Sequence, residues 1–351
     1  MFKDILTDIV SRGTISDIYV ITGSPVRVKD KGLIVNYNDE RLLPDAVNVI
    51  IEEIYKMAFD RSMSKLKAEG DDEFSFAIPG TARFRTSIFK QRGSLSAVIR
   101  IVKFELPDPT MLGIPENVLS TADINKGMVL VTGPAGSGKS TTLACIIDRI
   151  NNTRHGHIIT LEDPIEFIHR HKSCLVTQRE IGLDTESYIT GLRAALRQAP
   201  DAILLGEMRD YETIRTALTA AETGHMLYST LHTIGAANSI SRIVDIFNEQ
   251  AQAQIRVQLA AVLQAVISQQ LIPGADGTPV LALEVMRVTP AIRNLIRENK
   301  LHQIGNAIIA GQNEGMQDMD GSILKLYKSG RISKENALSY ASDPERMKGR
   351  L

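Results

Sequence analysis

The chain has 351 residues, of which 43% are hydrophobic and 23% are charged, so we expect it to fold rather than remain disordered. At roughly 100 to 200 residues per domain, this length predicts two domains. The 40 Lys and Arg residues nearly balance the 41 Asp and Glu residues, which excludes a global electrostatic attraction to nucleic acid or anionic lipid.

The sequence has no sign of a membrane span or of a cysteine-based site. No apolar run approaches the ~18 residues that a membrane span requires, and the N-terminus MFKDILTDIV mixes charged with apolar residues. We therefore expect a cytoplasmic protein. Cys145 and Cys174 are the only cysteines and lie far apart, which argues against a disulfide framework and a CxxC zinc site.

Residues 1–106 are predicted to form a first α+β domain. One helical face is predicted for Phe2, Ile5, Leu6, Ile9 and Val10, and a second apolar stripe runs from Val47 to Met57. Short β-rich runs between turn residues predict strands at residues 17–21, 26–29, 33–36, 74–78, 82–90 and 94–102. Clustered prolines then predict an interdomain linker over residues 107–117.

Residues 118–288 are predicted to form an α/β domain, because short apolar strands alternate there with helical stretches. This pattern indicates a mainly parallel sheet with crossover helices. The central strands are expected at residues 128–132, 157–161, 202–205 and 226–231. A glutamine-rich helix is predicted over residues 249–271, and a helical region is predicted over residues 289–351.

A phosphate-binding loop is the most specific motif of the sequence. Residues 133–140 match GxxxxGK[ST], follow the predicted strand MVLVT and precede the helical run TTLACIIDRI. Glycines let backbone N–H groups approach crowded phosphate oxygens at a helix N-terminus. Lys139 is expected to reach the β and γ phosphates of ATP, and Ser140 is expected to hold Mg²⁺. The predicted nucleotide-binding residues of this segment are Gly133, Pro134, Ala135, Gly136, Ser137, Gly138, Lys139, Ser140 and Thr141.

Acidic residues follow two of the predicted strands. Glu162 and Glu166 come after HIITL, and Glu207 comes after AILL. In parallel sheets ligands bind beyond the carboxyl ends of the strands, and NTP hydrolysis needs one carboxylate to organise Mg²⁺ and another to orient or deprotonate water. We therefore predict that Glu166 and Glu207 are catalytic, that Glu207 also holds Mg²⁺, and that Glu162 contacts the nucleotide. Helix caps or solvated loop acids are the alternative.

Two histidines bracket the strand MLYSTL. His225 precedes this strand and His232 follows it, so only His232 is expected at the ligand end of the sheet. We predict that His232 senses the γ-phosphate, and we include His225 among the nucleotide-binding candidates. A hydrogen-bonded core histidine is the alternative for each.

Two arginines are predicted to face each other in the first domain. If Arg92 and Gly93 form a two-residue hairpin turn, the strand register places Arg85 opposite Arg100. Directly opposed cations are destabilising unless an anion lies near them, so the pair indicates a phosphate group. Two solvated arginines that point apart are the alternative.

Four ordered segments resemble those of the secretion and type IV pilus motor ATPases, and most closely those of the PilT-type twitching-motility group. The likeness extends over essentially the whole chain. The segments are VTGPAGSGKSTTL for the phosphate loop, TLEDPIEF for the Asp box, LRAALRQAPDAILLGEMRD for the Walker B segment and ALTAAETGHMLYSTLHT for the His box. The stretch AIRNLIRE at residues 291–298 is similar to one that is typical of retraction-type members.

The resemblance implies a PAS-like N-terminal domain, a RecA-like ATPase domain and a homohexameric ring. It implies that Glu166 is the catalytic glutamate, that Glu207 belongs to Walker B, and that Arg83, Arg85 and Arg100 reach the nucleotide. It further implies ATP-driven pilus retraction through an inner-membrane platform protein, with a related accessory ATPase as another partner. The protein would work in the cytoplasm, at the inner membrane.

The AIRNLIRE stretch also reads as an amphipathic helix. Thr289 and Pro290 suit its N-cap and first position, and we expect a buried stripe of Ile292, Leu295 and Ile296. Arg293 and Arg297 are then predicted to point outward as a like-charged i, i+4 pair, which indicates an acidic partner.

Three other functions remain alternatives. The segment RQAPD resembles the accessory, PilU-type members, and Ser229 stands where glycine is common, so an accessory pilus ATPase is one alternative. A nucleotide-gated regulatory ring subunit is a second alternative, but the presence of both Glu166 and Glu207 argues against it. A nucleic-acid translocase is disfavoured by the neutral net charge and by an aromatic content of 5% without tryptophan.

Overall fold

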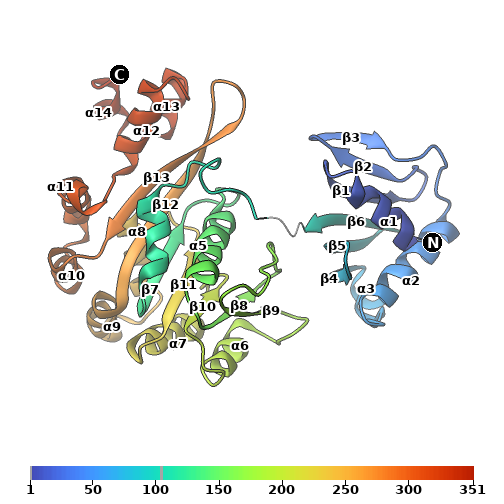
Figure 1. The fold of residues 1–351 in the computed structure, drawn as a ribbon, viewed down its shortest axis with the longest axis horizontal. Helices are drawn as coiled ribbons and strands as arrows, with labels where there is room; N and C mark the ends of the chain where they lie inside the picture. Colours follow the sequence, from blue (N-terminus) through green and yellow to red (C-terminus); the bar gives the residue numbers. More distant parts are fainter. Residues whose placement is uncertain (1, 103–105) are drawn as a thin grey trace. The chain divides into compact units, whose positions relative to one another are not determined.

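The computed structural model describes residues 2–102 and 106–351 (Figure 1). The chain divides into two compact units: the first comprises the described residues before 103 together with Glu166–Ile168, and the second comprises Leu106–Ile165 and His169–Leu351. Each unit has its own hydrophobic core. The predicted end of the first domain, near residues 104–106, falls largely outside the described residues.

The first unit is a six-stranded antiparallel sheet with the order β3-β2-β1-β6-β5-β4 and with helices on one face (Figure 1). Ile18, Phe84 and Ile99 of the sheet form its core together with Leu6 and Ile51 of the helices. The helices are α1 (Phe2–Ser11), α2 (Pro44–Met57) and α3 (Ser64–Glu69). The strands are β1 (Ile15–Ile21), β2 (Arg27–Asp30), β3 (Leu33–Asn36), β4 (Asp71–Ile78), β5 (Ala82–Gln91) and β6 (Ser94–Val102).

The β5–β6 hairpin has the predicted register. Arg92 and Gly93 form its turn, and Arg85 is paired with Arg100 across the two strands. Phe84 points into the core. Because successive side chains of a strand alternate between faces, Arg85 projects from the face that the helices leave open.

The second unit contains a seven-stranded sheet that is mainly parallel, and this parallel arrangement was predicted. Its order is β13-β12-β7-β11-β10-β8-β9, and among the described strands β12 and β13 form the antiparallel pair. β7 lies between β11 and β12, so the loop that follows β7 projects from the interior of the sheet's carboxyl edge. The strands are β7 (Gly127–Thr132), β8 (His157–Glu162), β9 (Leu175–Glu180), β10 (Ala202–Leu205), β11 (Met226–Leu231), β12 (Leu263–Pro273) and β13 (Pro279–Arg287).

Helices cover both faces of this sheet (Figure 1). Val129 packs in one cluster with Ile146 of α5, whereas Leu130 packs on the other face in a cluster that includes Leu192 of α6 and Ile214 of α7. Every residue of β7 is buried, as expected for a strand covered on both sides. The helices are α4 (Glu116–Leu119), α5 (Lys139–Thr153), α6 (Tyr188–Ala195), α7 (Tyr211–Glu222), α8 (Ala236–Asp245) and α9 (Glu249–Val262).

The predicted helix over residues 249–271 is wrong in its second part. α9 ends at Val262, and the residues from Leu263 onward form β12. β12 pairs with β7 on one side and with β13 on the other, so β7 is not an edge strand. The β-branched residues Val266 and Ile267 suit a buried strand, and this tertiary context outweighs the helix propensity of the glutamines. β9 and β13 were not predicted.

Helices form the C-terminal region, as predicted. At the start of α10 the Thr289 side chain accepts a hydrogen bond from the backbone N–H of Ile292, and Pro290 occupies the first turn. Ile292 and Ile296 are buried as predicted, whereas Leu295 is only half-buried. The helices are α10 (Pro290–Arg297), α11 (Ile304–Ala310), α12 (Met319–Lys328), α13 (Lys334–Tyr340) and α14 (Pro344–Lys348). None of the described helices is long and apolar enough to cross a membrane.

Arg293 corrects the prediction that both arginines of α10 point outward. Its half-buried guanidinium donates hydrogen bonds to the backbone oxygens of Ala260 and Ala261 at the end of α9, and to Oε1 of Gln264. Unpaired carbonyl groups at a helix C-terminus attract a cation, which explains this position. Arg297 is exposed, as predicted.

Candidate active site

The phosphate loop connects β7 to α5, and glycines give it its shape. Gly133 has a φ of 146° and Gly138 has a φ of 84°, values that favour glycine. A Cβ atom on Gly133 would overlap the backbone oxygen of Gln269, so the loop lies close against β12. The loop enters α5 at Lys139. The free N–H groups and the positive end of a helix dipole favour an anion at such a position.

Lys139 places a cation inside the loop. Its side chain is buried, and Nζ donates hydrogen bonds to the backbone oxygens of Gly133 at 2.9 Å and Pro134 at 2.8 Å. A buried ammonium group requires such partners. Ser140 and Thr141 follow in the first turn of α5 and are half-buried. The segment can therefore present an ammonium, a hydroxyl and backbone N–H groups to a phosphate.

Glu162 lies at the end of β8, where hydrogen bonds fix its side chain. Oε1 accepts one bond from Oγ1 of Thr160 at 2.6 Å and another from Nε2 of Gln178 on β9 at 3.3 Å. Glu166 lies four residues further along the chain, and its side chain is exposed. The two acids of this segment therefore differ: one is held against the sheet and the other is open to water.

Glu207 and His232 come together at the ends of the adjacent strands β10 and β11. Nε2 of His232 lies 3.5 Å from Oε2 of Glu207, and Nε of Arg209 donates to the same oxygen at 2.5 Å. The Glu207 side chain is 13% exposed and that of His232 is 51% exposed. The oxygen of a mostly buried carboxylate is thus held between two nitrogen groups. Arg209 was not predicted, because its pairing two residues from Glu207 follows from the loop conformation.

Tyr188 is surrounded by acidic residues that lie at or just after the ends of β8 and β10. Burial raises the pKa of its phenol group, and the negative charges of Glu207, Asp163 and Glu162 raise it further. These acids come from the segments that follow β8 and β10. Tyr188 was not predicted as a site residue, because it lies on α6 and outside the motif segments. It stays protonated at neutral pH and can donate a hydrogen bond among these acids.

His225 is not brought together with the phosphate loop in the second unit. It lies at the amino end of β11, where its backbone oxygen accepts a hydrogen bond from Gly127 at the start of β7, whereas the phosphate loop follows the end of β7. Its Nδ1 atom lies 3.1 Å from the oxygen of Ala220 and 3.2 Å from Oγ1 of Thr223. These contacts tie the strand to the end of α7.

The facing arginines of the first unit each have a carboxylate partner. Nε of Arg100 donates to Oδ1 of Asp17 at 2.9 Å, and Nη2 of Arg85 lies 3.7 Å from Oε2 of Glu73. Burial alone would raise the pKa of Asp17, but hydrogen bonds from Arg100 and Ser16 lower it below its usual value. The carboxylates offset the repulsion between the cations, so the register does not by itself require a phosphate. Arg83 lies two residues before Arg85, on the same face of β5.

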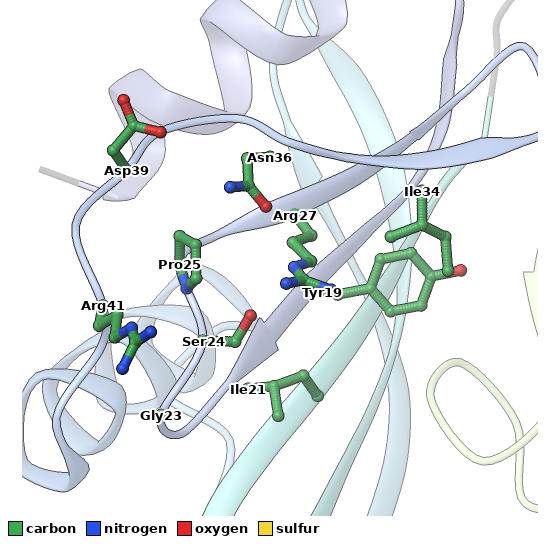
Figure 2. Close-up of a pocket in the computed structure, with 10 residues that line it drawn as sticks. All are labelled: Tyr19, Ile21, Gly23, Ser24, Pro25, Arg27, Ile34, Asn36, Asp39 and Arg41. Carbon is green, nitrogen blue, oxygen red and sulfur yellow. The ribbon is translucent and has the colours of Figure 1, made fainter.

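A separate pocket of about 590 Å³ opens on the first unit (Figure 2). Tyr19, Arg27 and Asn36, which line it, lie in one register row across β1, β2 and β3. Figure 2 shows Arg41 at its rim, on the segment that follows β3. The pocket shares no residue with the predicted nucleotide site, and we assign it no part in the chemistry.

Comparison with known proteins gives a family and several full-length relatives. Residues 1–279 match the family model described as type II/IV secretion system protein. The type IV pilus retractation ATPase PilT of Pseudomonas aeruginosa is 46% identical over 330 residues, which cover 94% of this chain and 95% of PilT. The type IV pilus ATPase PilU of the same organism is 36% identical over 97% of this chain and 88% of PilU.

Solved structures agree with these relatives. The crystal structure of the pilus retraction motor PilT with bound ADP has a TM-score of 0.90 to this chain at 44% identity. The match covers 98% of this chain and 99% of the PilT chain. A TM-score and a coverage this high extend the likeness beyond the phosphate-loop core to the whole fold.

Proposed function

The chain belongs to the family of type II/IV secretion system proteins, and we propose that it is a motor ATPase that powers retraction of a type IV pilus. The relative PilT, named for this activity, matches nearly the full length of the chain. The observation that carries the proposal is the shape of the phosphate loop, in which Lys139 is held by backbone carbonyls at the start of α5. The Glu207–His232 pair adds a positioned acid at the neighbouring strand ends.

In the proposed hydrolysis, each of a few side chains has a separate role. Backbone N–H groups of the loop and Lys139 bind the β- and γ-phosphates of ATP. Glu166, whose carboxylate is exposed, orients and deprotonates the attacking water. His232 contacts the γ-phosphate. When the γ-phosphate leaves, His232 moves, and its contact with Glu207 passes this movement to the carboxylate. Glu162, fixed by Thr160 and Gln178, supports the nucleotide side of the site.

Magnesium fits this site with few protein ligands. Among the described residues, no group of three or more His, Cys, Asp and Glu side chains could hold a metal ion on its own. Mg²⁺ usually takes one or two protein ligands and completes its shell with phosphate oxygens and water. We propose that the hydroxyl of Ser140 and the mostly buried carboxylate of Glu207 hold it, which would neutralise part of the phosphate charge.

The arginines of the first unit are proposed to contribute positive charge to a nucleotide phosphate of this or another copy of the chain. Arg85 and Arg100 are both substantially exposed, at 41% and 65% of their side-chain surface, so each can exchange its carboxylate partner for a phosphate. Arg83 belongs to the same row of β5. The proposal assigns no nucleotide contact to His225, since its ring is engaged with α7.

We further propose a homohexameric ring that works on the cytoplasmic side of the inner membrane. The ring would act on a membrane-embedded platform protein of the pilus machine, with a related ATPase as an accessory partner. The likeness to PilT over 94% of the chain supports this assembly. The near-zero net charge supports a protein partner rather than nucleic acid.

An accessory ATPase of the PilU type is the second candidate. The observation that favours it is the segment RQAPD at residues 197–201, which resembles the PilU-type sequence. Ser229 stands where glycine is common in the family, and its side chain donates a hydrogen bond to the oxygen of Leu205 inside the sheet. The identity to PilU is 36%, against 46% to PilT, so retraction remains the first choice.

Deletion of the gene separates a retraction motor from an assembly motor. A retraction motor predicts cells with many immobile pili, whereas an assembly motor predicts cells with none. Steady phosphate release by the purified protein, measured with and without DNA, completes the test. Release that requires DNA would favour a translocase, and no release would favour a regulatory ring subunit.

A further inference from the structure

The end of β12 places a buried amide beneath the phosphate loop. β12 runs parallel to β7, and Ser268 is paired with Thr132, the last residue of β7. The next residue, Gln269, therefore lies beside Gly133, where the loop begins. Its side chain is fully buried, and Nε2 donates a hydrogen bond of 2.5 Å to the backbone oxygen of Ser137.

The loop is shaped to admit this amide. A Cβ atom on Gly138 would lie 3.3 Å from Nε2 of Gln269, and one on Gly133 would overlap its backbone oxygen. Glycines at both ends of the loop thus allow β12 to approach. Because Gln269 has no exposed surface, water cannot replace its bond to Ser137 without a rearrangement of the loop or of the strand.

The bond to Ser137 also fixes the direction of the following N–H group. The carbonyl of Ser137 and the N–H of Gly138 belong to one planar trans peptide, so they point in opposite directions. A donor that holds the Ser137 oxygen toward β12 therefore turns the Gly138 N–H away from β12. The carbonyl of Gly138 is occupied by the N–H of Thr142 in α5, which fixes the next peptide as well.

We propose that Gln269 is a positioning residue that orients the phosphate loop, and in particular the N–H of Gly138, for nucleotide binding. The proposal rests on the proposed role of the loop as the nucleotide site. Gln269 acts from behind the loop, through the Ser137–Gly138 peptide. Its removal should weaken nucleotide binding rather than change the chemistry of the water attack.

The first test compares two identical substitutions on one strand. Gln269→Met keeps the length of the side chain but removes the donor. Gln270→Met makes the same change at the next, half-exposed position, whose side chain points to the other face. We expect ADP affinity to fall about tenfold in Gln269→Met, the typical effect of one lost hydrogen bond, and to be unchanged in Gln270→Met.

A second test uses a donor that pH can switch. In Gln269→Glu the new carboxylate would face the Ser137 oxygen as an acceptor, whereas the protonated acid can donate the original bond. Burial raises the pKa of a carboxyl group, so protonation is within reach between pH 8 and pH 6. We expect the ratio of wild-type to variant ADP affinity to shrink as pH falls over this range. Gln270→Glu should show no such change.

The outcomes separate the positioning role from the role of the loop. Unchanged ADP affinity in both Gln269 variants, with Lys139→Ala losing ADP, would overturn the positioning role and leave the loop assignment intact. A lower melting temperature with unchanged affinity would assign Gln269 to stability alone and would also overturn the proposal. Normal ADP binding by Lys139→Ala would instead refute the loop as the nucleotide site. If Gln269→Met fails to fold, the pH response of Gln269→Glu decides.

Discussion

The acidic residues of the site differ in how firmly they are held. Glu162 is bound by Thr160, and Glu207 is bound by Arg209, whereas Glu166 is exposed. An exposed carboxylate can contact a water molecule directly, whereas the oxygens that Thr160 and Arg209 engage are less available to water. This difference supports Glu166 as the general base and leaves Glu207 better suited to binding.

Glu166→Gln should retain ATP affinity, because the loop and Lys139 are unchanged. Its turnover should fall by about 10²-fold or more, the scale of a lost general base. Phosphate release and nucleotide titration measure the two effects separately. Glu335→Gln, an exposed acid on α13, is the matched control and should keep both. An unchanged rate in Glu166→Gln would move the role to Glu207 or Glu162.

Because the His169 side chain is buried, we expect the free energy of unfolding to fall as the pH is lowered. Burial lowers the pKa of its imidazole to about 4, an effect larger than those of the nearby Asp148 and Lys172 charges. The unfolded chain, with a histidine pKa near 6.5, then binds the proton more readily than the folded chain. The contribution to stability is therefore fully present above about pH 6.5 and is lost as pH falls toward 4.

His169→Phe should remove this pH dependence. Between pH 7 and pH 5 the wild type should lose ~2 kcal/mol of unfolding free energy through this group, and the variant should not. Urea unfolding at the two pH values measures the difference. His155→Phe changes an exposed histidine of the same unit and should keep the wild-type pH profile. Equal pH profiles for wild type and His169→Phe would contradict the assignment.

At the scale of elements, the hairpin and β12 show what a sequence can specify. The β5–β6 register follows from alternation and a two-residue turn, both of which are local, so the Arg85–Arg100 pairing was predictable. β12 was not, because its state depends on β7 and β13, which are distant partners. A run of buried residues such as AVISQ fits a helix or a strand until its neighbours are known.

Arg85 and Arg100, which face each other across β5 and β6, allow a prediction at the scale of elements. Arg85→Ala removes a side chain whose partner, Glu73, is itself 63% exposed, so the melting temperature should be nearly unchanged. Arg100→Ala leaves the buried carboxylate of Asp17 without its guanidinium and should cost about 1 to 3 kcal/mol. Thermal melts of the two variants measure this contrast.

The ATPase activity of the same two variants tests the proposed phosphate contact. Both should lose activity if the arginines serve a nucleotide, and Arg85→Ala is the cleaner case because its fold should be unaffected. Normal ATP turnover in Arg85→Ala would mean that Arg85 and Arg100 have a structural role only.

For the whole molecule, the sequence was sufficient for the family and the general architecture. The ordered motif segments and the strand-end positions of Glu207 and His232 follow from local patterns, and the structure brings those two side chains together. Contacts made across the fold were not predictable. Arg293, for example, pairs with the end of α9 because two helices pack together, and a helical pattern in α10 alone cannot reveal this.

We expect Arg297 to be the residue of α10 that transmits movement to a partner. It is exposed, whereas Arg293 supports α9, so a charge reversal at Arg297 alone should leave hydrolysis intact and abolish twitching. Phosphate release and colony spreading measure the two properties. Arg331→Glu, an exposed arginine that follows α12, is the control and should keep both. Loss of hydrolysis together with motility would contradict this separation of chemistry from coupling.

The central claim is that ATP hydrolysis at the phosphate loop retracts pili. Live imaging of labelled pili tests it most directly, in cells that lack the gene and carry either the wild-type copy or Glu166→Gln. Retraction events should return with the wild type, whereas Glu166→Gln cells should extend pili that do not retract. Frequent retraction in cells that carry only Glu166→Gln, or a complete loss of pili when the gene is deleted, would contradict the account.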